Sequence, residues 1–317
     1  MIKLKGDKKN MSEVKEIRQT YSTLKAIGTL KERKLEIAEK KFDDDTSYNT
    51  LSGSIVIAIN GNEHEFRIWM NDHFSTLNDE GKHNGNRAYD DALKIVEAEL
   101  GTTVELELKA DRFNDYVGKD NKLHSYDTLS VNGVKIVSND TEHMFEGKIE
   151  GIIHSIRPEI VKEDETGRLI VTFVGIGYGE KALPHNLYVN AYDADYFKDE
   201  YEIGSCCLLD IEVATNTYGV TTQTGGWGRR ANVSKGFTRV EWIVIGGEEP
   251  YTEERVNKKG EKLFIAHKDV KNLMDARDIM LEQIEKEGYK GGKSEPKQGL
   301  KAMNKPDVDL TDVECPF

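Results

Sequence analysis

The sequence predicts a mainly β protein of the α+β class, with two tandem five-stranded barrels, a C-terminal amphipathic helix and a disordered acidic tail. Three observations lead to this prediction. Runs that alternate apolar and polar residues dominate the chain, an order of strands and helix recurs in its second part, and its last residues are polar and acidic. The 317 residues suffice for two domains of ordinary size, each with its own core.

The clearest local signal is a β-hairpin in the segment SGSIVIAINGNEHEFRIWM. Its two alternating runs flank Asn60-Gly61, a dipeptide that suits a tight type I′ turn. Alternation gives each strand an inner apolar face. The inner residues are Ile55, Ile57 and Ile59 on the first strand, then Phe66, Ile68 and Met70 on the second. Glu65, Arg67 and Trp69 are therefore expected on the outer face.

The neighbouring segments complete a five-stranded pattern. An alternating stretch at about 23–40 predicts a long strand before the hairpin. After the hairpin, NRAYDDALKIVEAELG predicts a helix with Asn86 as N-cap, apolar residues as far as Leu100, and Gly101 as the stop. TTVELELKA and LHSYDTLSVNGVKIV then predict two more strands. A helix between the third and fourth of five strands resembles the OB-fold.

A second copy of this pattern follows. IWMNDHF at 68–74 aligns with AYDADYF at 191–197, and GTTVELEL at 101–108 resembles GSCCLLDIEV at 204–213. The interval between the matched blocks is shorter in the second copy, which predicts a short or vestigial helix there. We therefore expect two OB-fold-like domains, followed by two further segments. The boundaries are 1–140 and 143–247 for the domains, 248–288 for a linker and amphipathic helix, and 289–317 for a flexible linker and acidic tip.

Composition excludes several classes. The chain has no apolar run near the roughly 18 residues that a membrane span needs, and MIKLKGDKKN lacks the apolar core of a signal peptide. We expect a cytoplasmic protein without a membrane partner. Three cysteines, of which Cys206 and Cys207 are adjacent, give neither a disulfide framework nor a structural zinc site.

Enzyme motifs are incomplete. GIGYGEK at 175–181 lacks residues of both the phosphate loop and the dinucleotide fingerprint. KADR at 109–112 has Arg112 where the adenylated-lysine motif of ligases has glycine, and the acidic run 43–45 has no second cluster to complete a metal site. A turn, a surface lysine and a solvated loop are the simpler interpretations. We therefore expect no enzymatic activity, no cofactor and no metal.

The net charge of −13 argues against a nucleic-acid partner, but the charge is distributed unevenly. Residues 215–247 contain four bases and one acid, Glu241. Within TQTGGWGRRANVSKGFTR, Trp227 lies in a glycine-rich stretch, so it can offer a base a stacking surface beside cations that follow the phosphates. The candidate residues here are Trp227, Arg229, Arg230, Lys235, Phe237 and Arg239. The alternative is a tryptophan packed on its own domain.

Other aromatic and basic residues extend this hypothesis. Arg67 and Trp69 are the candidates in the first barrel, and Tyr188 and Tyr192 in the second. Each of these aromatic rings is alternatively covered by a helix or by the other domain. A second aromatic and basic loop is expected before the fifth strand of the first barrel. Its candidates are Arg112, Phe113, Tyr116 and Lys119. Trp242 alternates with Val240 and Val244, so we expect it in the core.

The segment PDVDLTDVECPF ends the chain. It resembles the C-terminal peptide of bacterial single-stranded DNA-binding proteins, in which acids precede an aliphatic residue, proline and phenylalanine. Here Cys315 replaces the aliphatic residue and the acids are interrupted. The matching positions are Asp307, Asp309, Asp312, Glu314, Pro316 and Phe317. The resemblance implies a tail that docks replication and recombination partners such as a helicase, primase, polymerase or recombinase. The alternative is a frayed acidic end.

Barrels with an acidic tail are similar to the single-stranded DNA-binding proteins of bacteriophages. The sequence therefore predicts a protein that coats and protects single-stranded DNA during replication, recombination and repair and that recruits partners through its tail. The alternative is a β-barrel module for protein–protein interaction or assembly that does not bind nucleic acid. Bases in 222–239 favour the first hypothesis, because a scaffold does not require them.

Overall fold

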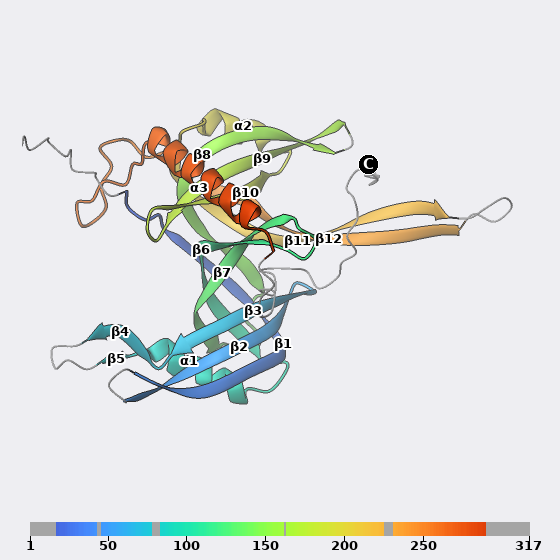
Figure 1. Cartoon of the computed structure of the whole chain (residues 1–317). Helices are drawn as coiled ribbons and strands as arrows, with labels where there is room; N and C mark the ends of the chain where they lie inside the picture. The colour runs from blue at the N-terminus through green and yellow to red at the C-terminus, as the bar shows by residue number, and fades with distance from the viewer. Residues whose placement is uncertain (1–16, 43–45, 78–82, 162, 225–230, 290–317) are drawn as a thin grey trace, which may run out of the picture.

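A computed structural model describes residues 17–42, 46–77, 83–161, 163–224 and 231–289, apart from the side chains of 75–77, 83 and 217–238. The described chain is mainly β (Figure 1). The strands are β1 (Ser22–Lys41), β2 (Ser47–Ile59), β3 (Asn62–Asn71), β4 (His73–Leu77), β5 (His83–Gly85), β6 (Thr103–Val117), β7 (Leu123–Ile136), β8 (Met144–Val161), β9 (Asp164–Gly177), β10 (Lys181–Val189), β11 (Cys206–Thr224) and β12 (Ala231–Gly247). The helices are α1 (Arg87–Glu97), α2 (Ala194–Glu200) and α3 (His267–Glu287).

The N-terminal half of the sheet comprises β1, β2, β3, β6 and β7, with α1 beside them, while β4 and β5 form a separate two-stranded sheet. Strand β1 pairs with β2 and with β6, β2 pairs with β3, and β6 pairs with β7, all antiparallel. Helix α1 lies in the chain between β3 and β6 and buries Tyr89, Ala92 and Ile95 in the main core. Apart from the added β4 and β5, these elements follow one another in the order that the sequence predicts, which is three strands, a helix and two strands.

The C-terminal half comprises β8 to β12 with α2, and its strands pair in a closed ring. Strand β8 pairs with β9 and β11, β9 with β10, and β11 with β12. The ring closes where β10 runs parallel to β12, with Leu187 opposite Trp242. Helix α2 has only seven residues, as the shortened interval in the sequence predicts.

The two halves form one continuous sheet because β1 and β8 pair directly. Residues Ser22 to Ile27 of β1 lie opposite Ile149 to Met144 of β8. Leu24 is therefore paired on both sides, with Leu108 of β6 and with Gly147 of β8. A Cβ atom at Gly147 would lie 2.3 Å from the carbonyl oxygen of Thr23, so only glycine lets the strands approach this closely.

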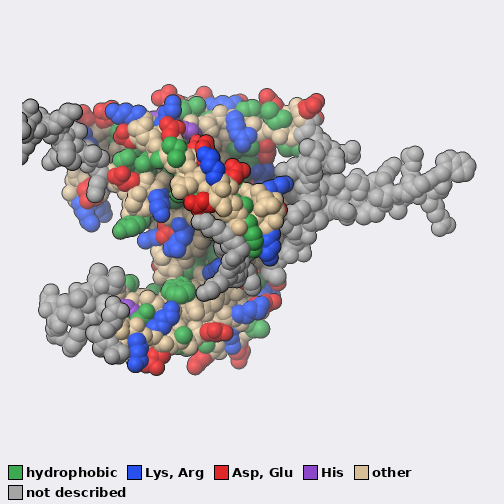
Figure 2. Space-filling view, in the orientation of Figure 1, with side chains coloured by type: hydrophobic (Ala, Val, Ile, Leu, Met, Phe, Trp, Pro, Cys, Tyr) green, Lys and Arg blue, Asp and Glu red, His purple; other side chains and the backbone are tan. Residues whose placement is uncertain are grey.

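Helix α3 covers the C-terminal half and confirms the amphipathic helix predicted before Gly288. Val270, with Leu273 and Met274, packs into a second core with Ile152 and Tyr251. Figure 1 shows α3 lying across the part of the molecule that contains β8 and β10, while β1 to β3 form the opposite end. Figure 2 shows the surface hollowed between these two ends. No helix in the described ranges is long and apolar enough to cross a membrane.

The predicted hairpin and helix start are confirmed. Asn60 and Gly61 have φ angles of 49° and 85°, as a type I′ turn requires. The six residues predicted to face inward, from Ile55 to Met70, are at most 5% exposed. The Asn86 side chain accepts a hydrogen bond from the amide of Ala88 at 3.1 Å. The predicted end of this helix was wrong, because α1 ends at Glu97 and Leu100 is 61% exposed.

Both predicted aromatic and basic loops are shorter than expected. Strands β6 and β7 stay paired up to Val117 and Leu123, and β11 and β12 stay paired up to Thr224 and Ala231. The end of β11, ATNTYGVTTQT, is rich in threonine and includes Val220, and such β-branched residues favour a pleated strand over an irregular loop. The described parts of both segments are therefore hairpin ribbons.

His64 of β3 is buried where the two halves meet. Its imidazole is 4% exposed, lies edge-on to Phe145 of β8 with a centroid separation of 5.6 Å, and has Nε2 3.3 Å from the hydroxyl of Thr215 on β11. Burial lowers the pKa of His64 to about 4. The neutral ring is therefore part of the contact between β3, β8 and β11.

We predict that Gly147→Ala lowers the free energy of unfolding by about 1–3 kcal/mol, because the added methyl group pushes β8 away from β1. Urea unfolding followed by circular dichroism measures the change. Gly85→Ala is the control, since a Cβ atom there meets nothing within 4 Å. Equal effects of the two substitutions would contradict the proposed close approach.

We predict that acid destabilises the protein through His64. The unfolded imidazole titrates near pH 6.5 and the folded one near 4, so the unfolded state takes up the proton first as pH falls. Stability is complete above about pH 6.5 and is lost progressively toward pH 4, with on the order of 2 kcal/mol lost between pH 7 and pH 5. His64→Leu should reduce that loss in urea titrations at both pH values. An unchanged pH dependence would refute this assignment.

Candidate nucleic-acid interface

The outer face of β3 carries the exposed tryptophan that the alternation predicts. Trp69 is 65% exposed, and Arg67 is exposed two residues before it on the same face. The Lys40 ammonium group of β1 lies 4.4 Å from the centroid of the Trp69 ring. One strand thus presents an aromatic surface and a cation, and a second cation reaches it from two strands away.

The register of β1, β2 and β3 extends this surface. Trp69 lies opposite Ser52 and Arg67 opposite Ser54, and Ser54 in turn lies opposite Lys34 of β1. Directly opposite residues of antiparallel strands share a face. We name this set the β1–β3 face. It comprises Lys34, Glu36, Lys40, Ser52, Ser54, Arg67 and Trp69, and the Lys34 ammonium group lies 2.9 Å from the Glu32 carboxylate.

A cluster of three rings lies at the end of this face, where β1 is connected to β2. Phe42, Tyr48 and His73 have pairwise centroid separations of 4.5 to 4.8 Å. Asp72 accepts hydrogen bonds from the Asn49 amide at 2.7 Å and from His73 at 3.0 Å, and these contacts lower the pKa of its carboxyl group against the opposing effect of burial. The cluster holds the end of the β1–β2 ribbon next to Lys40, which pairs with Tyr48.

This arrangement suits a single-stranded polyanion. A nucleobase can stack on the exposed indole, and Arg67, Lys34 and Lys40 lie where a sugar-phosphate chain would cross the three strands. The serine hydroxyls between them add neutral hydrogen-bonding groups. In OB-folds the second and third strands and the loop between the first and second are the usual ligand surface, and the β1–β3 face corresponds to that surface.

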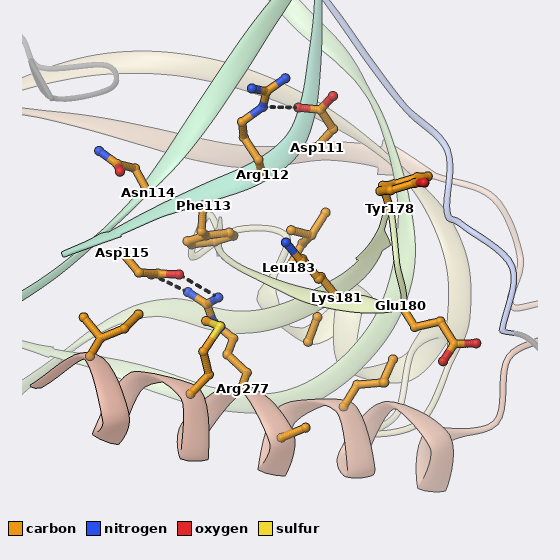
Figure 3. A pocket seen from close by; sticks show the side chains of 15 residues that line it. Asp111, Arg112, Phe113, Asn114, Asp115, Tyr178, Glu180, Lys181, Leu183 and Arg277 are labelled. Carbon is orange, nitrogen blue, oxygen red and sulfur yellow. Dashed lines mark hydrogen bonds and ion pairs between the residues drawn. The ribbon is translucent and has the colours of Figure 1, made fainter. Parts of the chain in front are cut away.

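The β6–β7 hairpin positions the next candidates differently from the prediction. Arg112 is exposed but lies 3.3 Å from its neighbour Asp111, and Lys119 is exposed in the turn. Tyr116 stacks on His124 with centroids 5.3 Å apart. Figure 3 shows Phe113 pointing toward Arg277 of α3, whose guanidinium group lies 4.6 Å from its ring centroid. Phe113 is therefore a packing residue of this hairpin.

Phe113 belongs to a row of planar groups that joins four elements. The Trp242 ring of β12 stacks on His185 of β10 at 5.1 Å, and His185 lies 5.6 Å from Phe113 of β6. Arg277 completes the row and forms two hydrogen bonds with Asp115, of 2.7 and 3.1 Å. Trp242 is 6% exposed, which confirms the prediction of a core residue. The row attaches the N-terminal hairpin to the C-terminal half and to α3.

The cleft in Figure 3 is electrically balanced. It has a volume of about 710 Å³ between β6, the β9–β10 turn and α3. Its bases are Arg112, Lys181 and Arg277, and its acids are Asp111, Asp115 and Glu180. Apolar residues of α3 form much of its wall, Met280 among them. What distinguishes the β1–β3 face from this cleft is the 65% exposed Trp69, on which a base can stack.

The expected exposure of Tyr188 was wrong. Its ring is 5% exposed, packs on Ile170 and Ile243, and has the guanidinium groups of Arg168 and Arg239 at 4.8 and 4.6 Å. Arg239 itself lies within 4 Å of two carboxylates rather than free in solvent. Tyr192, by contrast, is 83% exposed after β10, with its hydroxyl accepting from Asn190 at 3.2 Å.

The ends of β11 and β12 form a ribbon that we name the β11–β12 arm, residues 217–224 and 231–238. Figure 1 shows β11 and β12 extending together beyond the rest of the described chain. Tyr218 lies opposite Phe237 and Val220 opposite Lys235. Trp227, Arg229 and Arg230 lie outside the described residues. The side chains of Lys235 and Phe237 do so as well, and likewise the tail positions Asp307, Asp309, Asp312, Glu314, Pro316 and Phe317.

The sequence analysis missed Lys34, Lys40, Phe42 and Tyr48. Alternation in LKERKLEIAEKK indicates which residues of β1 share a face, but not which residues of β2 they meet. That register depends on the loop at 43–45 and on an irregularity between Leu30 and Glu32. The pairing therefore brings to Trp69 a lysine that is 29 residues away in the chain.

The chain was compared with known proteins. A match to the YorF family covers residues 14–287, so the chain belongs to that family. Two similar solved structures are a wild-type single-stranded DNA binding protein from Thermus aquaticus and a deletion mutant of that protein, both 11% identical to this chain. Each match covers 76% of this chain and 98% of the other, with TM-scores of 0.37 for the wild type and 0.39 for the mutant. No curated protein matches the chain.

Proposed function

We propose that this protein binds single-stranded DNA without enzymatic activity, that it consists of two tandem OB-fold-like barrels, and that it coats exposed strands during phage replication and recombination. The β1–β3 face carries the proposal. It combines a 65% exposed Trp69 with Arg67, Lys34 and Lys40 on three adjacent strands. Stacking on one aromatic residue contributes about 1–3 kcal/mol per base, and neighbouring cations release counterions from the phosphates.

We expect the Lys40 side chain to change its position when DNA binds to the β1–β3 face. Its ammonium group lies over the Trp69 ring in the free protein. Such an exposed cation–π contact is worth only about 0.5–1 kcal/mol, less than a stacked base contributes. An incoming base can displace Lys40 from the ring, and the lysine remains beside the phosphate of that nucleotide. The same residue therefore covers the ring in the free state and binds the anion in the complex.

The β11–β12 arm is the second proposed contact. Residues 217–238 include Arg229, Arg230 and Lys235 and contain no acid. Their aromatic residues are Tyr218, Trp227 and Phe237. The connection between the fourth and fifth strands of an OB-fold contacts ligands, and here that connection is residues 225–230 at the end of the arm. We propose that the arm closes over DNA bound elsewhere on the molecule, with Tyr192, Lys119 and Arg112 as further contacts.

The acidic residues at 307–314 and the terminal Pro316 and Phe317 are proposed to recruit replication and recombination proteins. Phenylalanine and its carboxylate can enter a pocket with a basic rim, and the acids steer that encounter. The tail also accounts for part of the negative charge of a DNA-binding chain, since it supplies four acids and no base after Lys305. Repulsion between these acids and DNA should weaken binding at low salt.

We predict that Trp69→Ala weakens binding of fluorescent oligo-dT by about 5- to 150-fold, the equivalent of one stacked base. Fluorescence anisotropy at moderate salt, with duplex of equal length as competitor, measures this. Tyr178→Ala is the matched control, because Tyr178 is 84% exposed outside the β1–β3 face. Unchanged affinity of the Trp69 variant, or an equal loss in the control, would show that DNA does not cross this face. If the intact chain does not bind oligo-dT even at low salt, the scaffold alternative holds.

We predict that removal of residues 306–317 raises oligo-dT affinity at low salt and abolishes binding of purified replication proteins. Removing only Pro316 and Phe317 should abolish partner binding and leave DNA affinity unchanged, because the acids remain. Anisotropy and surface plasmon resonance measure the two activities. Loss of DNA binding in the longer truncation would contradict the proposed role of the tail.

A further inference from the structure

A second cleft lies beside the base of the β11–β12 arm. It has a volume of about 470 Å³ and is lined by both aromatic rings and polar groups. The residues relevant here are Tyr126, Asn186, Tyr188, Arg239 and Trp242. A planar heterocycle fits such a lining, since the rings offer stacking surfaces and Asn186 offers a donor and an acceptor.

The charged residues that line this cleft are Arg239, Arg277, Asp127 and Asp278, and Arg239 is held less tightly than Arg277. Its Nη1 atom lies 3.7 Å from Glu159 Oε1 and 3.6 Å from Glu241 Oε1, longer than a charge-assisted hydrogen bond. Its side chain is 43% exposed. Arg168, which contacts the same two acids, lies 2.9 Å from Glu241 and is 17% exposed. Of the two arginines, Arg239 is thus the one that solvent and ligands can reach.

The two acids keep other partners if Arg239 moves. Glu241 is fully buried and accepts from Arg168 at 2.9 Å and from the Asn216 amide at 2.8 Å. Glu159 accepts from the Thr166 hydroxyl at 3.0 Å and from Arg168 at 3.4 Å. Departure of Arg239 therefore leaves neither carboxylate buried without a donor, which would otherwise make the movement costly.

We propose that this cleft is a second subsite for single-stranded DNA, which takes a base against Tyr188 and the adjoining phosphate on Arg239, and which Glu159 and Glu241 together hold closed in the free protein. The inference rests on the proposed function. Arg239 lies 4.6 Å from the Tyr188 ring centroid, so its movement exposes part of a ring that is otherwise 5% exposed. A phosphate can accept two parallel hydrogen bonds from a guanidinium group, whereas each carboxylate now offers one long contact.

Comparison of two charge-neutral substitutions tests the proposal. Glu159→Gln removes the more exposed of the two carboxylates that hold Arg239 and keeps an acceptor for Thr166 and Arg168. Glu165→Gln removes the same charge from an exposed position on β9. With labelled oligo-dT of about 30 nucleotides, enough for two OB-folds, Glu159→Gln should raise affinity by up to about fivefold and Glu165→Gln by less. In an Arg239→Ala background the gain from Glu159→Gln should vanish.

Equal gains from the two glutamine variants, or a gain that persists without Arg239, would overturn the subsite. A second readout does not depend on the stability of Glu159→Gln. Arg239→Ala alone should reduce the slope of log affinity against log salt concentration by about 0.7, because that is the value for one phosphate contact on a single strand. An unchanged slope would also overturn the proposed subsite. Failure of the intact chain to bind oligo-dT would instead refute the proposed function. Binding that depends on Trp69 but not on Glu159 or Arg239 would refute only this inference.

Discussion

The arrangement of the whole molecule depends on the pairing of β1 with β8. Residues 24–27 of β1 have β6 on one side and β8 on the other, and residues 146–149 of β8 pair with both β1 and β11. Backbone hydrogen bonds therefore run from the N-terminal half into the C-terminal half without a break. Two half-sheets joined in this way cannot rotate independently, because rotation would break ladder bonds in a buried region. The β1–β3 face and the strands from which the β11–β12 arm extends are consequently parts of one sheet.

Two further contacts strengthen that junction from opposite ends of the chain. Arg18, before β1, forms two hydrogen bonds of 2.8 Å with the buried Glu150 of β8. Arg277 of α3 does the same with Asp115 of β6, where its guanidinium group also covers Phe113. Both ion pairs are bidentate and largely withdrawn from water. Removing one partner of such a pair leaves the other charge buried and unpaired, which destabilises the protein by more than the intact pair stabilises it. They specify how the N-terminal strand, the hairpin and the last helix meet.

Local features could be predicted from the sequence and long-range ones could not. The Asn60-Gly61 turn, the Asn86 cap and the inward-facing residues of β2 and β3 follow from rules that act over a few residues. Alternation also put Tyr188 on the face opposite Leu187. The two arginines that cover Tyr188 come from β9 and β12, and no local pattern indicates them. The same limit applies to Lys40, which reaches Trp69 only through the register of three strands.

A chain with a net charge of −13 can bind DNA only if its cations are concentrated where the strand passes, and the β1–β3 face is the proposed place. Photochemical cross-linking of bromouracil-substituted single strands, followed by mass spectrometry of the cross-linked peptides, tests this most directly. The account predicts adducts within residues 62–71, centred on Trp69, and within the arm at 217–238. Adducts confined to peptides outside both segments, or an absence of adducts under conditions of saturating DNA, would contradict it.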